Sequence, residues 1–330
     1  MKKTIPLLFA LILMTSMTTR DFSYVEESLV QLEPSYFGQE VEAILGHIQD
    51  RHESIDYSNV GIYIEELRTG NNWVYNNGLV YDPSTDKTKG LFSSASAVKL
   101  AMAYASLRYM ELNDIPLRAT AFDPLSKDHY VLSEAIRDSI VTSSVAAYNK
   151  LVRWLTIPVA NATLEADGII NSTINSEMGL DAYWSLERNL RVYGTANISR
   201  FTPEDYGLIL KAVYNKSNEG NPYQMLLMQS LIDNKFHSRI PRGVSYRYEV
   251  AHKTGTYVEG GKISDAGIVL HPTNPYIIVV LTDKQEDFIK TEKFIRDFVW
   301  HIDELMSKRT LVINRRIHLA VLSTDQYLLY

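Results

Sequence analysis

The sequence of 330 residues contains no cysteine. This absence excludes disulfide bonds, thiolate zinc sites and cysteine nucleophiles. An excess of basic residues is also missing, because 33 lysines and arginines stand against 39 acidic residues, a formal net charge of −6. Without a basic stripe we expect no nucleic-acid partner. The remaining composition, 45% hydrophobic and 22% charged, is typical of a globular protein with an ample core, and we expect a monomer.

Long hydrophobic runs are missing as well, apart from one near the start of the chain. Lys2 and Lys3 precede an apolar run of ten residues, Ile5 to Met14. Such a run has the length of a secretory signal and is short for crossing a bilayer. We expect residues 1–20 to be a signal peptide or a membrane anchor that tethers the protein. The protein is therefore expected to be secreted, periplasmic or on the extracellular face of the membrane.

The order of helical and strand patterns predicts an α+β fold. Residues 21–38 are expected to be a linker, and residues 39–53 carry one apolar helical stripe. Alternation predicts a hairpin over residues 59–78. Three further strand patterns follow near the end of the chain, over residues 246–256, 263–271 and 276–283. We expect one antiparallel sheet of about five strands, with the terminal helices on one face and an all-helical subdomain beside it.

These patterns also set the expected domain boundaries. The main domain is predicted over residues 39–306, with the sheet formed by 39–90 and 245–306 and the helical subdomain by 91–244. Residues 307–330 lie beyond the last expected helix and have no assigned role. Apolar residues of one parity in this tail are compatible with an extra strand.

A serine and a lysine three positions apart, Ser96-x-x-Lys99, precede an apolar stretch that ends at Met110. On a helix this spacing places both side chains on one face. The same spacing occurs at Ser84-x-x-Lys87, but in a polar loop with no apolar helix after it. Because a nucleophile needs rigid support, Ser96 is the candidate nucleophile and Lys99 its base. A helix N-cap role for Ser96 is the alternative.

Two more short motifs carry hydroxyl and amine groups. Lys253-Thr254-Gly255, extended by Thr256, ends a strand pattern, where glycine permits a ligand to approach the backbone. These four residues are candidates for binding substrate, and a turn at the end of the strand is the alternative. Ser143 lies between two helical patterns, where it is a candidate proton relay or a helix cap.

The three motifs occur in the order typical of class A β-lactamases and penicillin-binding proteins. The chain resembles this superfamily, and most closely its class A β-lactamase branch, from about residue 40 to 306. Three other stretches are similar to family segments: "SSVAAYN", which ends at Asn149, "HSRIPRGV" and "NISRFTPEDYGLIL". The resemblance implies a β-lactamase/transpeptidase-like α+β fold and a serine hydrolase.

The chain departs from the family pattern in two places. The family motif Ser-Asp-Asn reads Ser143-Ser144-Val145, and valine lacks the amide that helps to position substrate and lysine. The family's Ω-loop motif Glu-x-x-Leu-Asn has its glutamate at Glu187, but Arg191 stands in place of the asparagine. By resemblance, Glu187 is the candidate base for the deacylating water. A surface glutamate paired with a neighbouring arginine is the alternative.

The resemblance also implies a mechanism. Ser96 attacks the carbonyl carbon of a β-lactam or an acyl-D-alanyl peptide, and Lys99 accepts the serine proton. Ser143 passes a proton to the leaving nitrogen, while Lys253 and Thr256 hold the substrate carboxylate. No metal or organic cofactor is required. A penicillin-binding D,D-peptidase with slow deacylation and a non-catalytic homologue that binds cell-wall peptides are the alternatives.

Overall fold

The structure, a computed structural model, describes residues 34–76, 81–82, 87–88, 90–179, 191, 198–244 and 248–325. The expected signal segment, residues 1–20, lies outside this part of the chain. Among the described helices, none is both long enough and apolar enough to cross a membrane.

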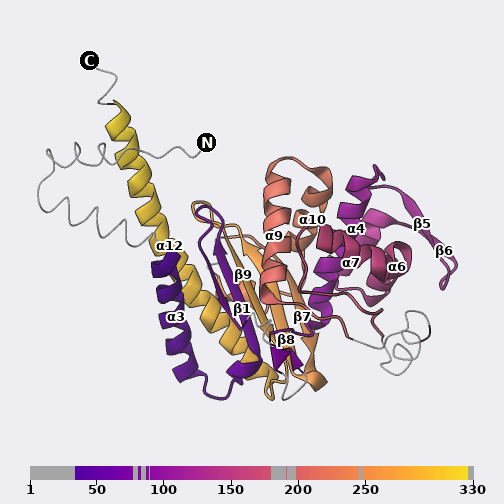
Figure 1. The fold of residues 1–330 in the computed structure, drawn as a ribbon, viewed down its shortest axis with the longest axis horizontal. Helices are drawn as coiled ribbons and strands as arrows, with labels where there is room; N and C mark the ends of the chain where they lie inside the picture. Colours follow the sequence, from indigo (N-terminus) through magenta and orange to yellow (C-terminus); the bar gives the residue numbers. More distant parts are fainter. Residues whose placement is uncertain are drawn as a thin grey trace, which may run out of the picture.

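Five antiparallel strands form the central sheet (Figure 1). Their order is β2 (Asn72–Tyr75), β1 (Val60–Glu66), β9 (Tyr276–Thr282), β8 (Lys262–Val269) and β7 (Val250–Tyr257). Every residue of β1 and β9 is buried, because elements cover both faces of the sheet. Strands from the two ends of the chain pair directly, with Val60 opposite Thr282. The predicted α+β fold with a five-stranded antiparallel sheet is confirmed.

Two long helices, α3 (Pro34–Arg51) and α12 (Phe288–Asp325), cover one face of the sheet (Figure 1). Their apolar stripes and the sheet residues beneath them form one core, which includes Val41, Ile48, Ile64, Phe298 and Ile302. The spacing of the apolar residues accounts for this packing, because residues three and four apart share one side of a helix.

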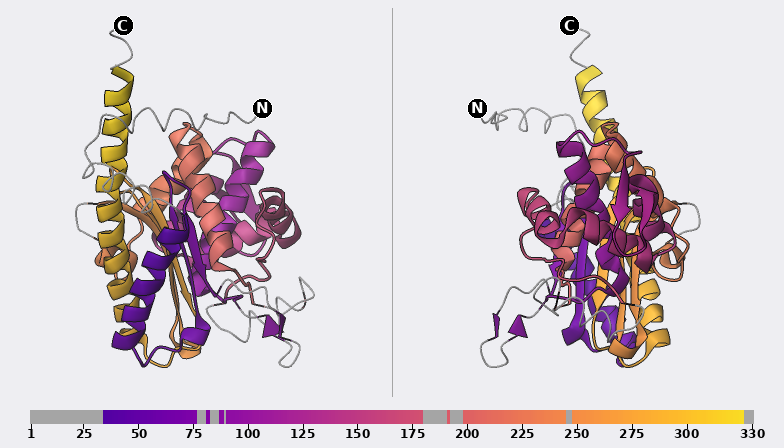
Figure 2. Two further views of the ribbon diagram at one scale, coloured as in Figure 1. Left: turned by 60° about the vertical axis from the view of Figure 1, so that its left-hand side comes forward. Right: turned by 90° about the vertical axis from the view of Figure 1, so that its right-hand side faces the viewer.

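Both terminal helices differ in length from the expectation. Helix α3 begins at Pro34, inside the expected linker, because proline suits the first helical position and Phe37 is already buried in the core. The extra strand expected after residue 306 is wrong, since α12 continues to Asp325 and extends past the sheet (Figure 2). A helix that is already packed adds residues without a new nucleation cost, and Arg309 fastens this one by ion pairs to Glu66 and Glu40.

A helical block covers the other face of the sheet (Figure 1). Its elements are η2 (Ala95–Ala97), α4 (Val98–Leu112), α5 (Leu132–Val141), α6 (Val145–Leu155), α7 (Ile157–Ala166), α9 (Pro203–Asn218) and α10 (Pro222–Ile232). The short helix α11 (Ile240–Gly243) lies on the opposite face instead, where it packs against α12. Polar side chains cap three helices of the block: Ser144 caps α6, Thr202 caps α9 and Asn221 caps α10. Helix α4 is buried on nearly every side, so the block packs around it.

Short elements complete the described fold. A small hairpin, β5 (Thr120–Asp123) with β6 (Asp128–Val131), precedes α5. The pair β3 (Tyr81–Asp82) and β4 (Lys87–Thr88) lies ahead of η2, and the 3-10 turns η1 (Tyr57–Asn59) and η3 (Val258–Gly260) flank strands of the sheet.

Candidate active site

The turn that carries Ser96 leads directly into the buried helix α4. Lys99, in the first turn of α4, is completely buried, and its Nζ lies 2.7 Å from Oγ of Ser96. The three-residue spacing therefore brings the two side chains together, as predicted. The N-cap alternative for Ser96 is wrong, because the N-cap positions of η2 and α4 are Ser94 and Ala97.

The backbone of this turn is strained and is supported from behind. Ala95 has a φ angle of +49°, a conformation that L-residues adopt only where the surrounding structure enforces it. The hydroxyl of Ser94 lies 2.5 Å from the hydroxyl of Tyr206 on α9, and both groups are buried. Tyr206 in turn stacks on Phe201, with 4.8 Å between ring centroids. These contacts fix the position of Ser96 relative to the core.

Ser143, between α5 and α6, joins the two lysines of the site. Its Oγ accepts hydrogen bonds from Nζ of Lys99 at 3.3 Å and from Nζ of Lys253 at 3.1 Å. The capping alternative for Ser143 is wrong, because Ser144 is the N-cap of α6 and its hydroxyl accepts a backbone hydrogen bond. Val145 takes the first helical position and offers no polar group. Ser143 itself has a φ angle of +56°, a second strained residue at this place.

Lys253-Thr254-Gly255 lies in the edge strand β7. The strand continues to Tyr257, so the alternative of a turn at this motif is wrong. A Cβ atom on Gly255 would overlap the backbone carbonyl oxygen of Ser94. Only glycine therefore permits β7 to approach the turn that carries the candidate nucleophile.

The two lysines make this site electrostatically unusual. Burial lowers the pKa of Lys99 to about 8. Burial, together with the nearby charge of Lys99, lowers the pKa of Lys253 to about 7. Neither amine forms an ion pair with a carboxylate within the described residues. At neutral pH the pair therefore holds fewer than two protons, and one amine is able to accept a proton.

No metal site accompanies these groups: the described ranges contain no cluster of three or more His, Asp or Glu side chains that would hold an ion.

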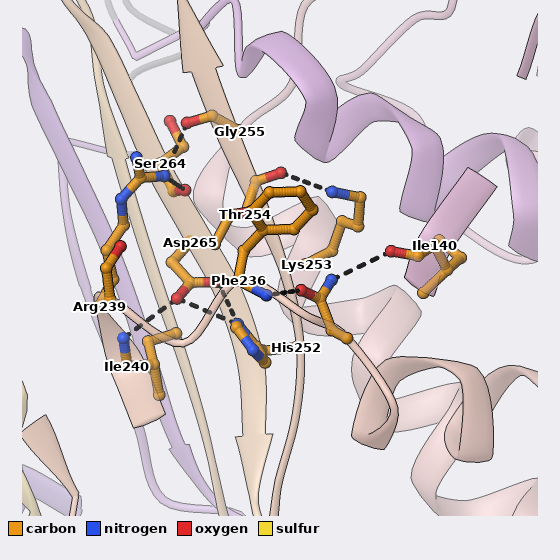
Figure 3. A network of polar contacts seen from close by, with 12 residues as sticks. Ile140, Phe236, Arg239, Ile240, His252, Lys253, Thr254, Gly255, Ser264 and Asp265 are labelled. Carbon is orange, nitrogen blue, oxygen red and sulfur yellow. Dashed lines mark hydrogen bonds and ion pairs between the residues drawn. The ribbon is translucent and has the colours of Figure 1, made fainter. Parts of the chain in front are cut away.

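Arg239 extends the site, and the sequence analysis did not identify it. Its buried guanidinium donates hydrogen bonds to the carbonyl oxygens of Gly255 and Ser264, at 2.9 and 2.7 Å (Figure 3). It also donates to the hydroxyl of Thr256 at 2.6 Å and pairs with Glu292 on α12. The segment "HSRIPRGV" was the available signal, but no periodicity shows that its first arginine turns toward the strand.

Glu187, the candidate base, lies outside the described residues, together with the rest of 180–190. The chain on both sides of this gap is fixed. The carboxamide of Asn149 donates to the carbonyl oxygen of Met178 at 2.6 Å and accepts from its N–H at 2.8 Å. After the gap, Phe201 forms a backbone bridge with Phe92, just ahead of the candidate nucleophile. The described residues on each side of this segment are thus fixed by these hydrogen bonds.

An antiparallel sheet with a helical block, and a cluster of two serines and two lysines where they meet, defines the superfamily of serine-reactive β-lactamases and penicillin-binding proteins. Residues 47–299 match the model of the beta-lactamase enzyme family, and the chain belongs to this family. No curated protein matches the sequence.

Solved structures of this superfamily share the fold. A mutant of PBP-A, in an acyl-enzyme complex with penicillin G, is 18% identical with a TM-score of 0.63, over 81% of this chain and 97% of that one. The extended-spectrum β-lactamase TLA-3 is 17% identical with a TM-score of 0.64, over 81% and 99%. A class A β-lactamase representative from Bacteroides cellulosilyticus is 18% identical with a TM-score of 0.63, over 83% and 98%. At these identities the likeness shows the fold alone.

Proposed function

We propose that the protein is a serine hydrolase that acts on β-lactams through an acyl-enzyme formed on Ser96. The observation that carries the proposal is the continuous set of contacts from Ser96 to Lys99, Ser143 and Lys253. A serine hydroxyl is a weak nucleophile until a neighbouring base accepts its proton. Lys99 is buried next to it, and because its pKa is lowered to about 8 it loses its proton far more readily than an exposed lysine.

Ring opening requires a proton at the leaving nitrogen. Lys99 takes the proton of Ser96 as Oγ attacks the carbonyl carbon, and the hydroxyl of Ser143 connects this amine to the nitrogen that leaves. The backbone N–H groups of Ser96 and Thr256 are the proposed oxyanion hole. Such donors typically contribute about 3–4 kcal/mol to lowering the barrier.

The substrate carboxylate decides which lysine carries the charge. We place it beside Lys253, Thr254 and Thr256, with Arg239 behind the hydroxyl of Thr256 at 2.6 Å. A bound carboxylate favours the charged form of the nearest amine. The proton of the lysine pair therefore moves to Lys253 when substrate binds, which leaves Lys99 neutral and ready to act as base.

Deacylation distinguishes a β-lactamase from a slow penicillin-binding D,D-peptidase. We propose Glu187 as the base that activates the deacylating water. Two observations favour the peptidase as a second candidate: the apolar Val145 and the arginine at 191. Glu187→Gln separates the two. If Glu187 is the base, this variant acylates at the normal rate and its adduct persists; if the adduct lifetime is unchanged, the assignment of Glu187 is wrong.

One experiment tests the acyl-enzyme. Purified protein is incubated with benzylpenicillin and followed by intact mass and peptide mapping, alongside a chromogenic cephalosporin assay. We expect an adduct on Ser96, with steady hydrolysis for a β-lactamase or a persistent adduct for the peptidase. Ser96→Ala abolishes the adduct, whereas the matched control Ser84→Ala, from the second Ser-x-x-Lys, leaves it unchanged. A folded wild-type sample with neither adduct nor turnover supports the non-catalytic homologue that binds cell-wall peptides.

We further propose that residues 1–20 direct the protein out of the cytoplasm, as a cleaved signal or as a tether, and that the protein is a monomer. The motivation is the Lys2-Lys3 start followed by the apolar run Ile5–Met14. Fractionation of expressing bacteria tests this, with mass analysis of the mature N-terminus. Full-length protein in the cytoplasmic fraction contradicts it.

A further inference from the structure

Behind Lys253, on the opposite side of strand β7, lies a second polar pair that the mechanism has not used. His252 and Asp265 are both completely buried, and Nδ1 of His252 lies 2.9 Å from Oδ1 of Asp265 on the neighbouring strand β8 (Figure 3). Nε2 of His252 is buried without a hydrogen-bond partner in the described part of the chain. The hydrogen-bond pattern therefore assigns the Nδ1–H tautomer, which donates to Asp265 and leaves its negative charge in place.

Asp265 also holds the segment that carries Arg239. Its Oδ2 accepts a hydrogen bond at 3.0 Å from the backbone N–H of Ile240, the residue that follows Arg239 and starts α11 (Figure 3). Arg239 itself has an unusual backbone conformation, with φ −117° and ψ −104°. One carboxylate thus fixes the turn from which the guanidinium reaches Gly255 and Thr256.

Asp265 is moreover a buried negative charge next to buried positive ones. Its charge favours the protonated forms of Lys253 and Arg239, against burial and against their mutual repulsion. The charged or titratable groups around it come from several elements: Arg239 before α11, Glu292 on α12, Lys253 and His252 on β7, Lys99 on α4 and His237, whose ring centroid is 5.9 Å from that of His252. Glu292 is committed to Arg239 and Ser238, so Asp265 is the carboxylate placed directly behind β7.

We infer that Asp265, oriented by His252, is a positioning residue for the carboxylate-binding part of the site. It aligns Arg239 through the N–H of Ile240, and its charge favours the protonated form of Lys253 that binds the substrate carboxylate. The inference rests on the proposed function. The side chains of Asp265 and His252 are both completely buried, so neither is expected to touch substrate.

Asp265→Asn tests this role, because asparagine keeps the size and one acceptor oxygen but removes the charge. Acylation of the full chain by benzylpenicillin is followed by intact mass between pH 5.5 and 9. We expect the rate at pH 8 to fall by up to about tenfold, because a fall of one unit in the pKa of Lys253 reduces its charged fraction up to tenfold. The falling, alkaline limb of the pH profile is expected to move to lower pH.

Asp303→Asn is the matched control. Asp303, on α12 itself, is also buried and accepts a hydrogen bond from Tyr276 on β9, and none of the site contacts described above includes it. We expect this variant to lose stability without moving the pH profile. If Asp265→Asn does not fold, His252→Asn replaces it: its amide still donates toward Asp265, and a smaller shift in the same direction is expected.

The outcomes separate this inference from the proposed function. A wild-type protein that forms no adduct on Ser96 refutes both. Normal acylation of the wild type, with an unchanged alkaline limb in Asp265→Asn, refutes the positioning role alone. A loss of rate that matches the loss of melting temperature in Asp303→Asn, with no shift of the profile, also refutes it, because that is the behaviour of a purely structural residue.

Discussion

On the α12 face of the sheet, buried charges meet opposite charges, whereas on the face toward the helical block two buried lysines meet each other. Arg309 lies 2.7 Å from one oxygen of Glu66 and 2.9 Å from the other, and 2.8 Å from Glu40. Lys99 and Lys253 instead share the hydroxyl of Ser143. Burial is similar in the two places, so the difference lies in the partners.

The comparison separates stability from reactivity. A buried cation with matched carboxylates keeps its charge, as Arg309 does: although burial opposes the charge, the hydrogen bonds and charge of Glu66 hold the pKa of the guanidinium above its usual value. A buried amine without such a partner has its pKa lowered, which makes it a proton acceptor near neutral pH. The ion pairs of Arg309 join α12 to the sheet, whereas the lysine pair provides an amine that can accept the proton of Ser96.

The largest expected effect follows from removing the base. Lys99→Met fills the same volume without an amine, and we expect acylation by benzylpenicillin to slow by about 10²–10⁴-fold, the usual contribution of a general base. The melting temperature is expected to stay the same or rise, since a buried amine without a carboxylate is removed. Mass spectrometry of the adduct measures the acylation rate, and thermal unfolding measures the melting temperature. Normal acylation in this variant contradicts the role of Lys99.

The matching change on the other face is Arg309→Met. It leaves Glu66 buried and unpaired, and we expect a loss of stability of about 3–5 kcal/mol, the typical cost of breaking a buried ion pair. Denaturant unfolding measures this loss. Below the unfolding transition, acylation of Ser96 is expected to be unchanged. If Arg309→Met were as stable as the wild type, the ion pairs on the α12 face would not stabilise the fold as proposed.

Gly255→Ala forces the two halves of the site apart. Because the added Cβ would overlap the carbonyl oxygen of Ser94, strand β7 or the turn η2 has to move. A misplacement of about 1 Å in an active site costs roughly 10²-fold in rate. We expect a loss of that size in acylation, measured at a temperature where the variant is folded. Ser264→Ala, at the position paired with Gly255 on β8, is a control for changes in the strand pair.

The pH dependence of acylation sharpens the comparison further. Acylation needs one neutral and one charged lysine. With pKa values of about 7 for Lys253 and about 8 for Lys99, this state is most populated between them. The rate constant kcat/KM for a β-lactam is therefore expected to rise as the pH increases from about 6 and to fall above about 8. A rate that stays flat across this range would contradict the shared proton.

The smallest expected effect is on stability. The pKa of Lys253 is lowered on folding from 10.5 to about 7, so the unfolded chain binds more protons between these values. The cost of burying this lysine is thus greatest below pH 7 and declines as the pH approaches 10.5. We expect Lys253→Met to raise the melting temperature by roughly 2–4 °C per kcal/mol of cost removed, and more at about pH 6 than at about pH 9. A Lys253→Met variant that melts below the wild type at about pH 6, or that gains less at about pH 6 than at about pH 9, would contradict this.

The sequence predicts part of this site and misses part, for physical reasons. Ser96 and Lys99 could be paired because helical spacing alone brings them together. The place of Lys253 followed from the motif order, since no local rule joins it to a serine 110 positions away. Arg239 and Asp265 could not be found in this way, because their roles depend on contacts between α11, β7 and β8 that leave no local pattern.

The fold shows the same division. Strand alternation and helical stripes predicted the sheet and its two covering helices, because those patterns record which side of an element is buried. The C-terminal tail was interpreted as a possible strand because its apolar residues share one parity, whereas it continues the packed helix α12. The start of α3 at Pro34 was missed because proline permits a helix start as readily as a linker.

Strand β1 has consequences for how the chain acquires its shape during synthesis. Its partner β9 lies far along the chain, as the pairing of Val60 with Thr282 shows. Such distant pairing gives a high contact order, which slows folding. A nascent chain that already contains Ser96 and Lys99 therefore lacks the sheet that would complete their surroundings. A premature stop before β9 therefore yields a polypeptide that contains Ser96 and Lys99 but lacks the complete sheet that surrounds them in the folded protein.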